Sequence, residues 1–376
     1  PDMENKPAPP DQIKVSQTAN LWRAMAHGLG VTLAAMCLLL LGEAVLDVGP
    51  LVPIAVLLTA LIAIINNLGY AELAANSSRP GGAYALVHAN TGRSSLSFFT
   101  GWMLMLSCLG LGGVLIRGAA SQLTRLLFNL LNISIPIGLL TTGLFTVLIL
   151  ESFLSRRDKQ RVWFTLPLIV LLTLLILVAV PRLPEIEYTT QVPQSSLAIT
   201  ILMAAFVGVE IVATKQQRIR HPDVNLPRAL LLTPALSALI GIGVALGVGP
   251  SLAVIPDAPL ASLGSIIGGI VGESALLIIG VVILTLSASR MLKTSLHQAH
   301  AMGQDGFWPS RSWRSSSRHI IPPRIVLVVG LLALPLAWIP IRLLSQIASL
   351  LYLLVLMAVN IKLIQRRVRL SDVFFE

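Results

Sequence analysis

Charged side chains are scarce in this sequence. Only 12% of the 376 residues are Asp, Glu, Lys or Arg, whereas an ordinary soluble domain carries about 25%. Cysteine is also rare, and because Cys37 and Cys108 both lie inside apolar runs, we expect two buried thiols rather than a disulfide framework or a metal pair. Hydrophobic residues make up 55% of the chain, and the mean hydropathy is +0.82. This balance excludes a soluble domain and indicates an integral membrane protein.

Long apolar runs recur along the whole chain. A transmembrane helix needs roughly 20 predominantly apolar residues. We therefore expect an all-α membrane protein with ten transmembrane helices, at about residues 25–47, 51–71, 97–127, 135–153, 162–180, 197–214, 229–249, 270–297, 324–341 and 343–361.

The basic residues cluster in alternate loops. The formal net charge is +10, and most of the 27 lysines and arginines fall on the side of the N-terminus when the ten spans are threaded in order. Cytoplasmic loops carry such an excess, so we expect both termini in the cytoplasm and the basic loops near anionic lipid headgroups. Nucleic-acid binding is the poorer interpretation. We expect cytoplasmic tails at 1–24 and 362–376, with Met3 as the natural start.

The sixth predicted span holds a glycine and a carboxylate in an otherwise apolar run. Gly208 lies between two valines and two residues before Glu210, which is a place where a helix can break. A carboxylate within a span is expensive to bury and is a candidate functional residue. Two interpretations stay open. Either Gly208 permits close packing and Glu210 pairs internally, or the stretch lines a substrate site, where irregular backbone is tolerated.

The eighth predicted span carries two hydroxyls followed by two cations. Thr285 and Ser287 can offer oxygens to a cation, and Arg290 and Lys293 are i, i+3 neighbours on one helix face. The two cations either extend to the cytoplasmic surface or line a water-filled vestibule and supply fixed positive charge there.

Several short motifs occur in a fixed order. AELAANSSRPGGAY (71–84) follows the second span, and Gly101-Trp102 opens the third. AAFVGVE (204–210) lies in the sixth span and HPDVNLPRAL (221–230) follows it. APLAS (258–262) precedes the eighth span and AMGQDGFWP (301–309) follows it. Together they resemble the amino acid–polyamine–organocation permease superfamily over most of the chain.

The resemblance implies a leucine-transporter-type fold. Residues 25–181 and 182–361 would form two five-helix repeats related by a pseudo-two-fold axis in the membrane plane. The substrate would lie between spans one and six, both discontinuous. The implied site residues are Gly42, Ala205, Phe206, Val207, Gly208, Val209 and Glu210. Among these, Phe206 would act as a gate, and Glu210 would brace unwound backbone or carry a proton. Thr285 and Ser287 would face the position that sodium takes in sodium-coupled relatives.

The chain departs from the family pattern in three places. The first span reads VTLAAMCLLLLG (31–42), without the glycines that break it in the family, so we expect a poor break or one near Gly42 and Glu43. In some family members a lysine in the fifth span stands in for sodium, but the fifth span here has no lysine. Gln216-Gln217 stand where the family often has two acidic residues. Arg290 and Lys293 would take over the electrostatic role of sodium, which favours proton coupling or exchange.

Three classes of function follow from these observations. We expect a secondary transporter of an amino acid or related small amine, in a bacterial inner membrane and without a cofactor; no P-loop motif is present. The alternative is a transport fold retained as a scaffold or regulatory subunit with a partner chain, motivated by the departures. A membrane enzyme is disfavoured because His297 and His300 have no Glu or Cys nearby, and a metal site needs three or four ligands.

Overall fold

The computed structural model describes residues 20–75, 81–92, 94–154, 165–179, 195–216, 219–252, 257–308 and 321–375. Helices account for nearly all of these residues, which confirms the predicted all-α class. They are α1 (Leu21–Ala35), a π-helical turn (Met36–Leu40), α2 (Leu41–Val48), α3 (Val52–Ala75), α4 (Gly82–Thr91), α5 (Ser95–Leu131), α6 (Ile137–Leu154), α7 (Thr165–Ala179), α8 (Ser195–Phe206), a 3-10 turn (Val207–Val209), α9 (Glu210–Thr214), α10 (Pro222–Leu252), α11 (Pro259–Gln304), α12 (Pro323–Ala333) and α13 (Ile341–Phe375).

Seven helical runs within the described residues are long and apolar enough to cross a bilayer. One of them, Leu21–Ala75, includes both the first and the second predicted spans, joined by the 3-10 turn Gly49–Leu51. The fifth and ninth predicted spans coincide with α7 and α12, which have only 15 and 11 residues. Each of the ten predicted ranges therefore overlaps a helix among the described residues, while the structure shows seven runs of full length.

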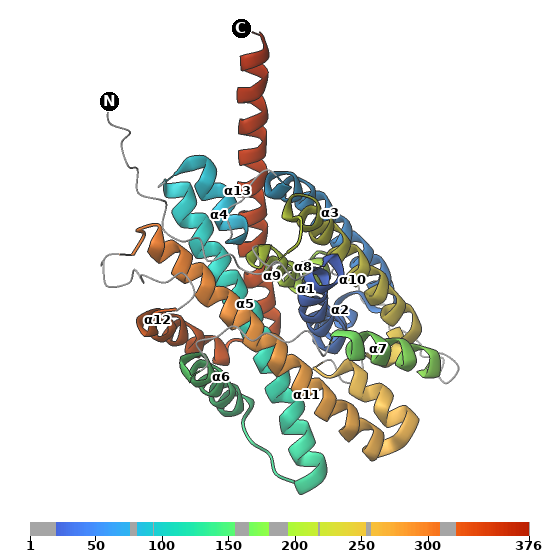
Figure 1. The fold of residues 1–376 in the computed structure, drawn as a ribbon. Coiled ribbons are helices and arrows are strands. Elements are labelled where there is room, and N and C mark those ends of the chain that lie inside the picture. The colour runs from blue at the N-terminus through green and yellow to red at the C-terminus, as the bar shows by residue number, and fades with distance from the viewer. Residues whose placement is uncertain are drawn as a thin grey trace.

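The helix α11 changes direction within its length. Its backbone leaves helical geometry at Gly268 and Gly269, where φ of Gly269 is +57°. Residues 259–267 therefore form a separate arm, visible in orange-yellow at the lower end of α11 (Figure 1). The predicted eighth span, which begins at residue 270, corresponds to the part after this kink.

Helices far apart in the sequence pack into two groups (Figure 1). In the first group, α5 and α11 lie side by side, with α6 and α12 against them. In the second group, α3 and α10 pack together with α1 and α8. The long helix α13 contacts α5, α8 and α3, so it joins the two groups. The boundary between the groups is formed by α1 and the turn Val207–Val209 on one side and by α5 and α11 on the other.

Large apolar side chains cover the outside of the bundle. Leu57, Ile65, Leu239 and Leu331 each expose more than half of their surface. Apolar patches of this extent on a protein surface mark an interaction with another apolar phase. Around helices of this length, they form the surface that faces lipid.

Candidate functional site

The helix α1 and the 3-10 turn Val207–Val209 pack in direct contact at the centre of the bundle. A Cβ added at Gly208 would lie 2.9 Å from Thr32 Oγ1 and 3.1 Å from the Thr32 backbone nitrogen. A Cβ added at Gly28, one turn earlier on α1, would lie 2.8 Å from Val212 and 3.5 Å from the carbonyl oxygen of Gly208. Glycines on both helices therefore let the two backbones approach closely, as small residues do in membrane helix pairs.

The predicted site residues 205–210 lie at this crossing. They are all buried, and the five that carry side chains have no exposed surface. Phe206 and Glu210, on either side of the turn, keep right-handed helical dihedral angles, and the Glu210 amide bonds to carbonyls within the turn. The predicted discontinuity is therefore at the expected position but is mild. The helix tightens into a 3-10 turn and does not unwind.

The first span is irregular before Gly42, not at it. Residues Met36–Leu40 form a π-helical turn, and Gly42 follows it inside the regular helix α2, where both Gly42 and Glu43 are buried. Of the two expected alternatives, the poor break agrees with this π-helical turn, whereas a break at Gly42 and Glu43 is not seen. A π-helical turn keeps its backbone hydrogen bonds, in an i→i+5 pattern, and so requires no glycine. A search for glycine in the sequence could not find it.

Gln122 of α5 bonds to this π-helical turn. Its Nε2 donates to the carbonyl oxygens of Leu38 and Asp257, each at 3.2 Å. A side chain at Gly280 of α11 would overlap Gln122 Oε1, so the glycine leaves the space that Gln122 occupies. Gln122 thus ties together the π-helical turn, α5 and the segment before α11. This contact closes one end of the crossing, which we call the Gln122 clamp.

Glu210 makes the corresponding contact at the other end. Its Oε1 accepts hydrogen bonds from the Tyr70 hydroxyl of α3 at 2.9 Å and from the Ala83 backbone N–H, at the start of α4, at 2.7 Å. Gly82 has a φ of +69°, and a side chain there would overlap Glu210 Oε1. Glu210 Oε2 is buried and has no hydrogen-bond partner among the described residues. The Glu210 clamp, made of Tyr70, Gly82, Ala83 and Glu210, holds α4 against the bundle.

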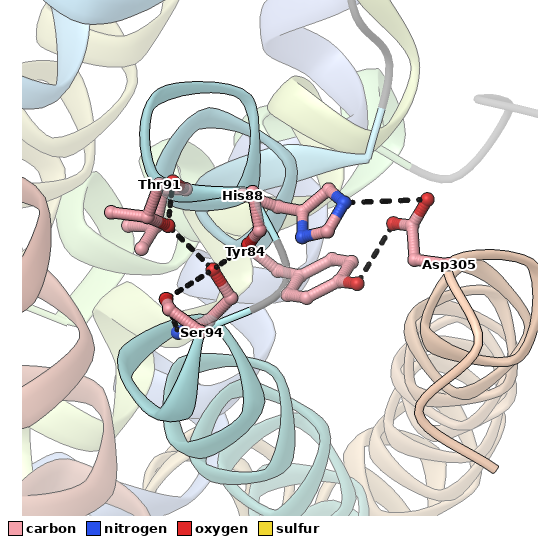
Figure 2. Close-up of polar contacts among 8 residues, drawn as sticks. Tyr84, His88, Thr91, Ser94 and Asp305 are labelled. Atoms are coloured by element: carbon pink, nitrogen blue, oxygen red, sulfur yellow. Dashed lines mark hydrogen bonds and ion pairs between the residues drawn. The ribbon is translucent and has the colours of Figure 1, made fainter.

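Asp305, which ends α11, contacts α4 as well (Figure 2). Its Oδ2 accepts a hydrogen bond from the Tyr84 hydroxyl at 2.8 Å, and its Oδ1 lies 3.6 Å from His88 Nε2. The rings of Tyr84 and His88 stack with centroids 5.7 Å apart, and Phe307 packs edge-on against both. The AMGQDGFWP motif therefore docks on the helix that follows the PGGAY motif. The helix α4 is held by α9 through Glu210 and by α11 through Asp305.

The predicted cation-site residues of α11 lie in different environments. Ser287 and Arg290 are buried, whereas Thr285 is only half-buried. Lys293 Nζ bonds to Glu151 Oε1 on α6 at 2.6 Å, and Ser289 Oγ donates to the other oxygen of the same carboxylate at 3.0 Å. Glu151 therefore compensates the charge of Lys293. Arg290, 4% exposed, is the deeply buried cation of the two.

Sequence reasoning missed polar residues that contact the predicted ones or the irregular turn of the first span. Tyr70, Gln122 and Glu151 were not singled out, although each is a polar residue in or beside an apolar span. That was a usable signal, because polar groups in a bilayer need partners. The pairing itself depends on how the helices pack. Within the described ranges, no group of three or more His, Cys, Asp and Glu side chains could hold a metal ion.

Apolar helices long enough to cross a bilayer, packed around a close central crossing, define an all-helical membrane protein. Comparison with known proteins identifies its class as that of transport proteins. A family model described as amino acid permease matches residues 20–370, and the chain belongs to this family. The chain is 25% identical over 359 residues to the inner membrane transport protein YbaT of Escherichia coli (strain K12), covering 92% of this chain and 83% of that protein.

The fold is also similar to that of a solved transporter structure. The crystal structure of MhsT in complex with L-phenylalanine superimposes with a TM-score of 0.61, at 14% sequence identity, over 89% of this chain and 87% of that one. At this identity the likeness concerns the fold alone. The resemblance to the amino acid–polyamine–organocation superfamily is confirmed by the family match.

Proposed function

We propose that this chain is a secondary active transporter of amino acids or related small amines, working by alternating access with proton coupling or exchange. The observation that carries the proposal is one closely packed central crossing with a distinct clamp at each end. Alternating access needs a site near the midplane and two closures that open one at a time. The Glu210 clamp and the Gln122 clamp are built from different residues and different helices, so one can open while the other stays closed.

The proposed topology is ten crossings of the inner membrane, with both termini in the cytoplasm. Residues 25–181 and 182–361 would form two inverted five-helix repeats, and α1 and α8 would then be equivalent helices. Support comes from a helix overlapping each of the ten predicted ranges and from the similarity of the fold to MhsT. The end that carries α4 and the C-terminus would face the cytoplasm, because the basic residues cluster there.

The substrate would enter where α1 separates from the turn at Gly208. Residues 205–210 have no exposed surface, so the conformation described is closed and the helices must move before a substrate binds. The crossing is lined by apolar side chains, among them Leu33, Met36, Phe206 and Val207. This lining favours an amino acid or amine with an apolar side chain. Its charged groups would be held by backbone released from the π and 3-10 turns, with Phe206 as the gate.

Coupling would depend on two buried ionisable groups. Glu210 has one oxygen in two hydrogen bonds, and its other oxygen meets no partner in the part of the chain that the structure describes. A proton added to that oxygen would neutralise the carboxylate that holds α4. Hydrogen bonds to a charged acceptor are roughly twice as strong as neutral ones, so protonation would loosen this end. Arg290, on the helix that packs against α1 and α9, would supply the positive charge that sodium supplies in other transporters.

Thermal unfolding of the detergent-purified protein tests the proposal. The panel would contain amino acids with small, apolar, acidic and basic side chains and the corresponding amines, in sodium or potassium chloride, at two pH values. A ligand present at 100 times its dissociation constant stabilises the folded state by about 2.7 kcal/mol. We expect a single class of apolar substrate to raise the midpoint in both salts, and the same compound to be taken up by proteoliposomes.

Two observations favour a second candidate, a scaffold or regulatory subunit. The first span has no glycine at its irregular turn, and the crossing is packed without exposed surface. Such a protein would melt cooperatively, respond to no compound in the panel and show no uptake in liposomes. Co-purification of a partner chain from its native membrane would then replace the transporter proposal.

A further inference from the structure

His88 of α4 and Asp305 at the end of α11 form a polar contact between segments that are far apart in the sequence (Figure 2). His88 Nε2 lies 3.6 Å from Asp305 Oδ1, and the two side chains are only 10% and 14% exposed. The other ring nitrogen, His88 Nδ1, is buried and meets no hydrogen-bond partner in the described part of the chain. A change in the charge of this ring therefore acts mainly on Asp305.

The surroundings fix both groups in position before any change in charge. The Tyr84 ring stacks on the His88 ring with centroids 5.7 Å apart, and the Phe307 ring packs edge-on with centroids 5.8 Å apart. The Tyr84 hydroxyl donates to Asp305 Oδ2 at 2.8 Å, while Oδ1 of the same carboxylate lies beside His88. A proton added to His88 would therefore find the carboxylate already in place.

The strength of this contact depends on pH. Histidine is the side chain that ordinarily changes its charge between about pH 5 and 8. The separation of 3.6 Å is longer than a hydrogen bond, so a neutral imidazole contributes little to holding Asp305. A protonated ring adds the attraction between two unit charges, and partial burial reduces the screening of this attraction by salt. Protonation of His88 therefore strengthens the hold of the α11 end on α4.

Other elements bring further ionisable groups to this end of the bundle. The helices α3, α5, α9 and α13 all contact α4. The titratable and charged residues that these helices and the last turns of α11 carry at this end are Tyr70, Glu72, Glu210, Lys215, His300, Lys362, Arg366 and Arg367. Glu210 bonds to the first turn of α4, Glu72 pairs with Arg367, and α5 contacts Thr91 of α4 through a hydroxyl. Among the described residues, Asp305 is the acidic group within ion-pair distance of His88.

We propose that His88 and Asp305 form a pH-sensitive latch, which holds α4 in the closed position when His88 is protonated. The proposal rests on the proposed function, in which the α4 end opens and closes during transport. A proton on Glu210 would weaken the contact of α4 with α9, whereas a proton on His88 strengthens the contact with α11, so the two groups respond to protons in opposite directions. Through His88, acidification on the α4 side would slow the opening of that end, and proton-coupled uptake would limit itself.

Hydrogen exchange of α4 tests the latch. Deuterium uptake of the α4 peptide would be measured by mass spectrometry on the purified chain at about pH 6 and about pH 8, on either side of an ordinary histidine titration. His88→Gln keeps a polar side chain but cannot change its charge, and comparing it with the wild type at the same pH cancels the pH dependence of the chemical exchange step. We expect the ratio of the variant rate to the wild-type rate to be about three times larger at the lower pH, which is the scale of a partly exposed ion pair.

Two further variants make the test specific. In an Asp305→Asn background, which keeps an acceptor for the Tyr84 hydroxyl, the ratio for His88→Gln should be equal at both pH values. His297→Gln is the matched control, because His297 is an exposed histidine of α11 whose ring contacts the Lys293 carbonyl oxygen. Its α4 exchange should follow that of the wild type at both pH values.

Three results would overturn the latch. They are a ratio that does not change with pH, a pH-dependent ratio that persists without the Asp305 carboxylate, and an equal response of the His297→Gln control. If His88→Gln does not fold, Asp305→Asn alone must show the same larger acceleration at the lower pH. Exchange is measured without substrate, so its result is separate from the result of the transport assays.

Discussion

Ala83 and Glu210 are 127 positions apart in the sequence, and a hydrogen bond of 2.7 Å joins the Ala83 backbone N–H to Glu210 Oε1. Because this N–H belongs to the first turn of α4, the position of α4 depends on the position of α9. A side chain beside the central crossing thus controls a helix at the end of the bundle. The first two predictions concern this link.

Tyr70→Phe should weaken the Glu210 clamp without removing it. The variant loses one hydrogen bond to a buried carboxylate, and bonds to charged groups contribute about 1.5–3 kcal/mol. We expect the population open at the α4 end to rise about tenfold or more. An Ala205→Cys reporter should then react faster with an impermeant thiol reagent added from that side. Tyr352→Phe is the control, because the Tyr352 hydroxyl is buried and makes no hydrogen bond with the described residues. Equal acceleration in both variants would contradict the role of Tyr70.

Glu210→Gln tests whether this carboxylate carries a proton. The amide keeps the shape and an acceptor oxygen for Ala83, so the protein should fold. Uptake driven by a proton gradient should fall at least tenfold, while exchange of substrate across the membrane should persist. The measurement compares gradient-driven uptake and counterflow in the same proteoliposomes. Unchanged gradient-driven uptake would leave Glu210 with a bracing role only.

Gly82→Ala should be strongly destabilising. A Cβ there overlaps Glu210 Oε1, and the φ of +69° is itself unfavourable for alanine. We expect the free energy of unfolding to fall by about 2–4 kcal/mol, because the variant combines backbone strain at position 82 with a disrupted buried hydrogen bond to Glu210. Gly143→Ala on α6 is the matched control, because nothing lies within 4 Å of its added Cβ. Thermal unfolding should show a lower midpoint for the first variant and an equal or higher one for the second.

Gln122→Glu should open the opposite end. The substitution keeps the size of the side chain but replaces the donor to the carbonyls of Leu38 and Asp257 with an acceptor. Leaving buried carbonyl groups without hydrogen-bond donors costs about 1–3 kcal/mol of folding free energy. The Ala205→Cys reporter should react faster from the side opposite α4 and no faster from the α4 side. Faster reaction from both sides would indicate general unfolding and not the opening of one clamp.

Tyr84 and Asp305 should show energetic coupling. The Tyr84→Phe and Asp305→Ala variants each remove the same 2.8 Å hydrogen bond, so their effects on stability should not add. A double-mutant cycle should give a coupling of about 1 kcal/mol. Thr91→Ala with Asp305→Ala is a suitable comparison pair, because Thr91 bonds to Val87 and Ser97 and not to Asp305. A coupling near zero for the first pair would show that the Tyr84–Asp305 hydrogen bond does not help to hold α4, and would leave the contact of Asp305 with His88 to be tested in the same way.

The sequence was sufficient for much of the fold, because span length and hydropathy reflect the thickness of the bilayer. It also located the irregular turn at Gly208 and drew attention to Glu210, since a glycine and a buried carboxylate are both unusual in an apolar span. It failed where geometry depends on packing. The π-helical turn at Met36–Leu40 has an ordinary apolar sequence. The compensation of Lys293 by Glu151 depends on α6 lying beside α11, which no local pattern reveals.

The helix α4 is anchored to α9 by Glu210 and to α11 by Asp305. The helix α9 packs against α1 and α10 of the second group, whereas α11 belongs to the first group, so a motion that separated the two groups would stretch one of these contacts before the other. The weaker of the two contacts would break first, and α4 would then move with the group that holds it by the stronger contact. The strength of the weaker contact of this short helix would therefore limit how readily the α4 end of the protein opens in the proposed transport cycle.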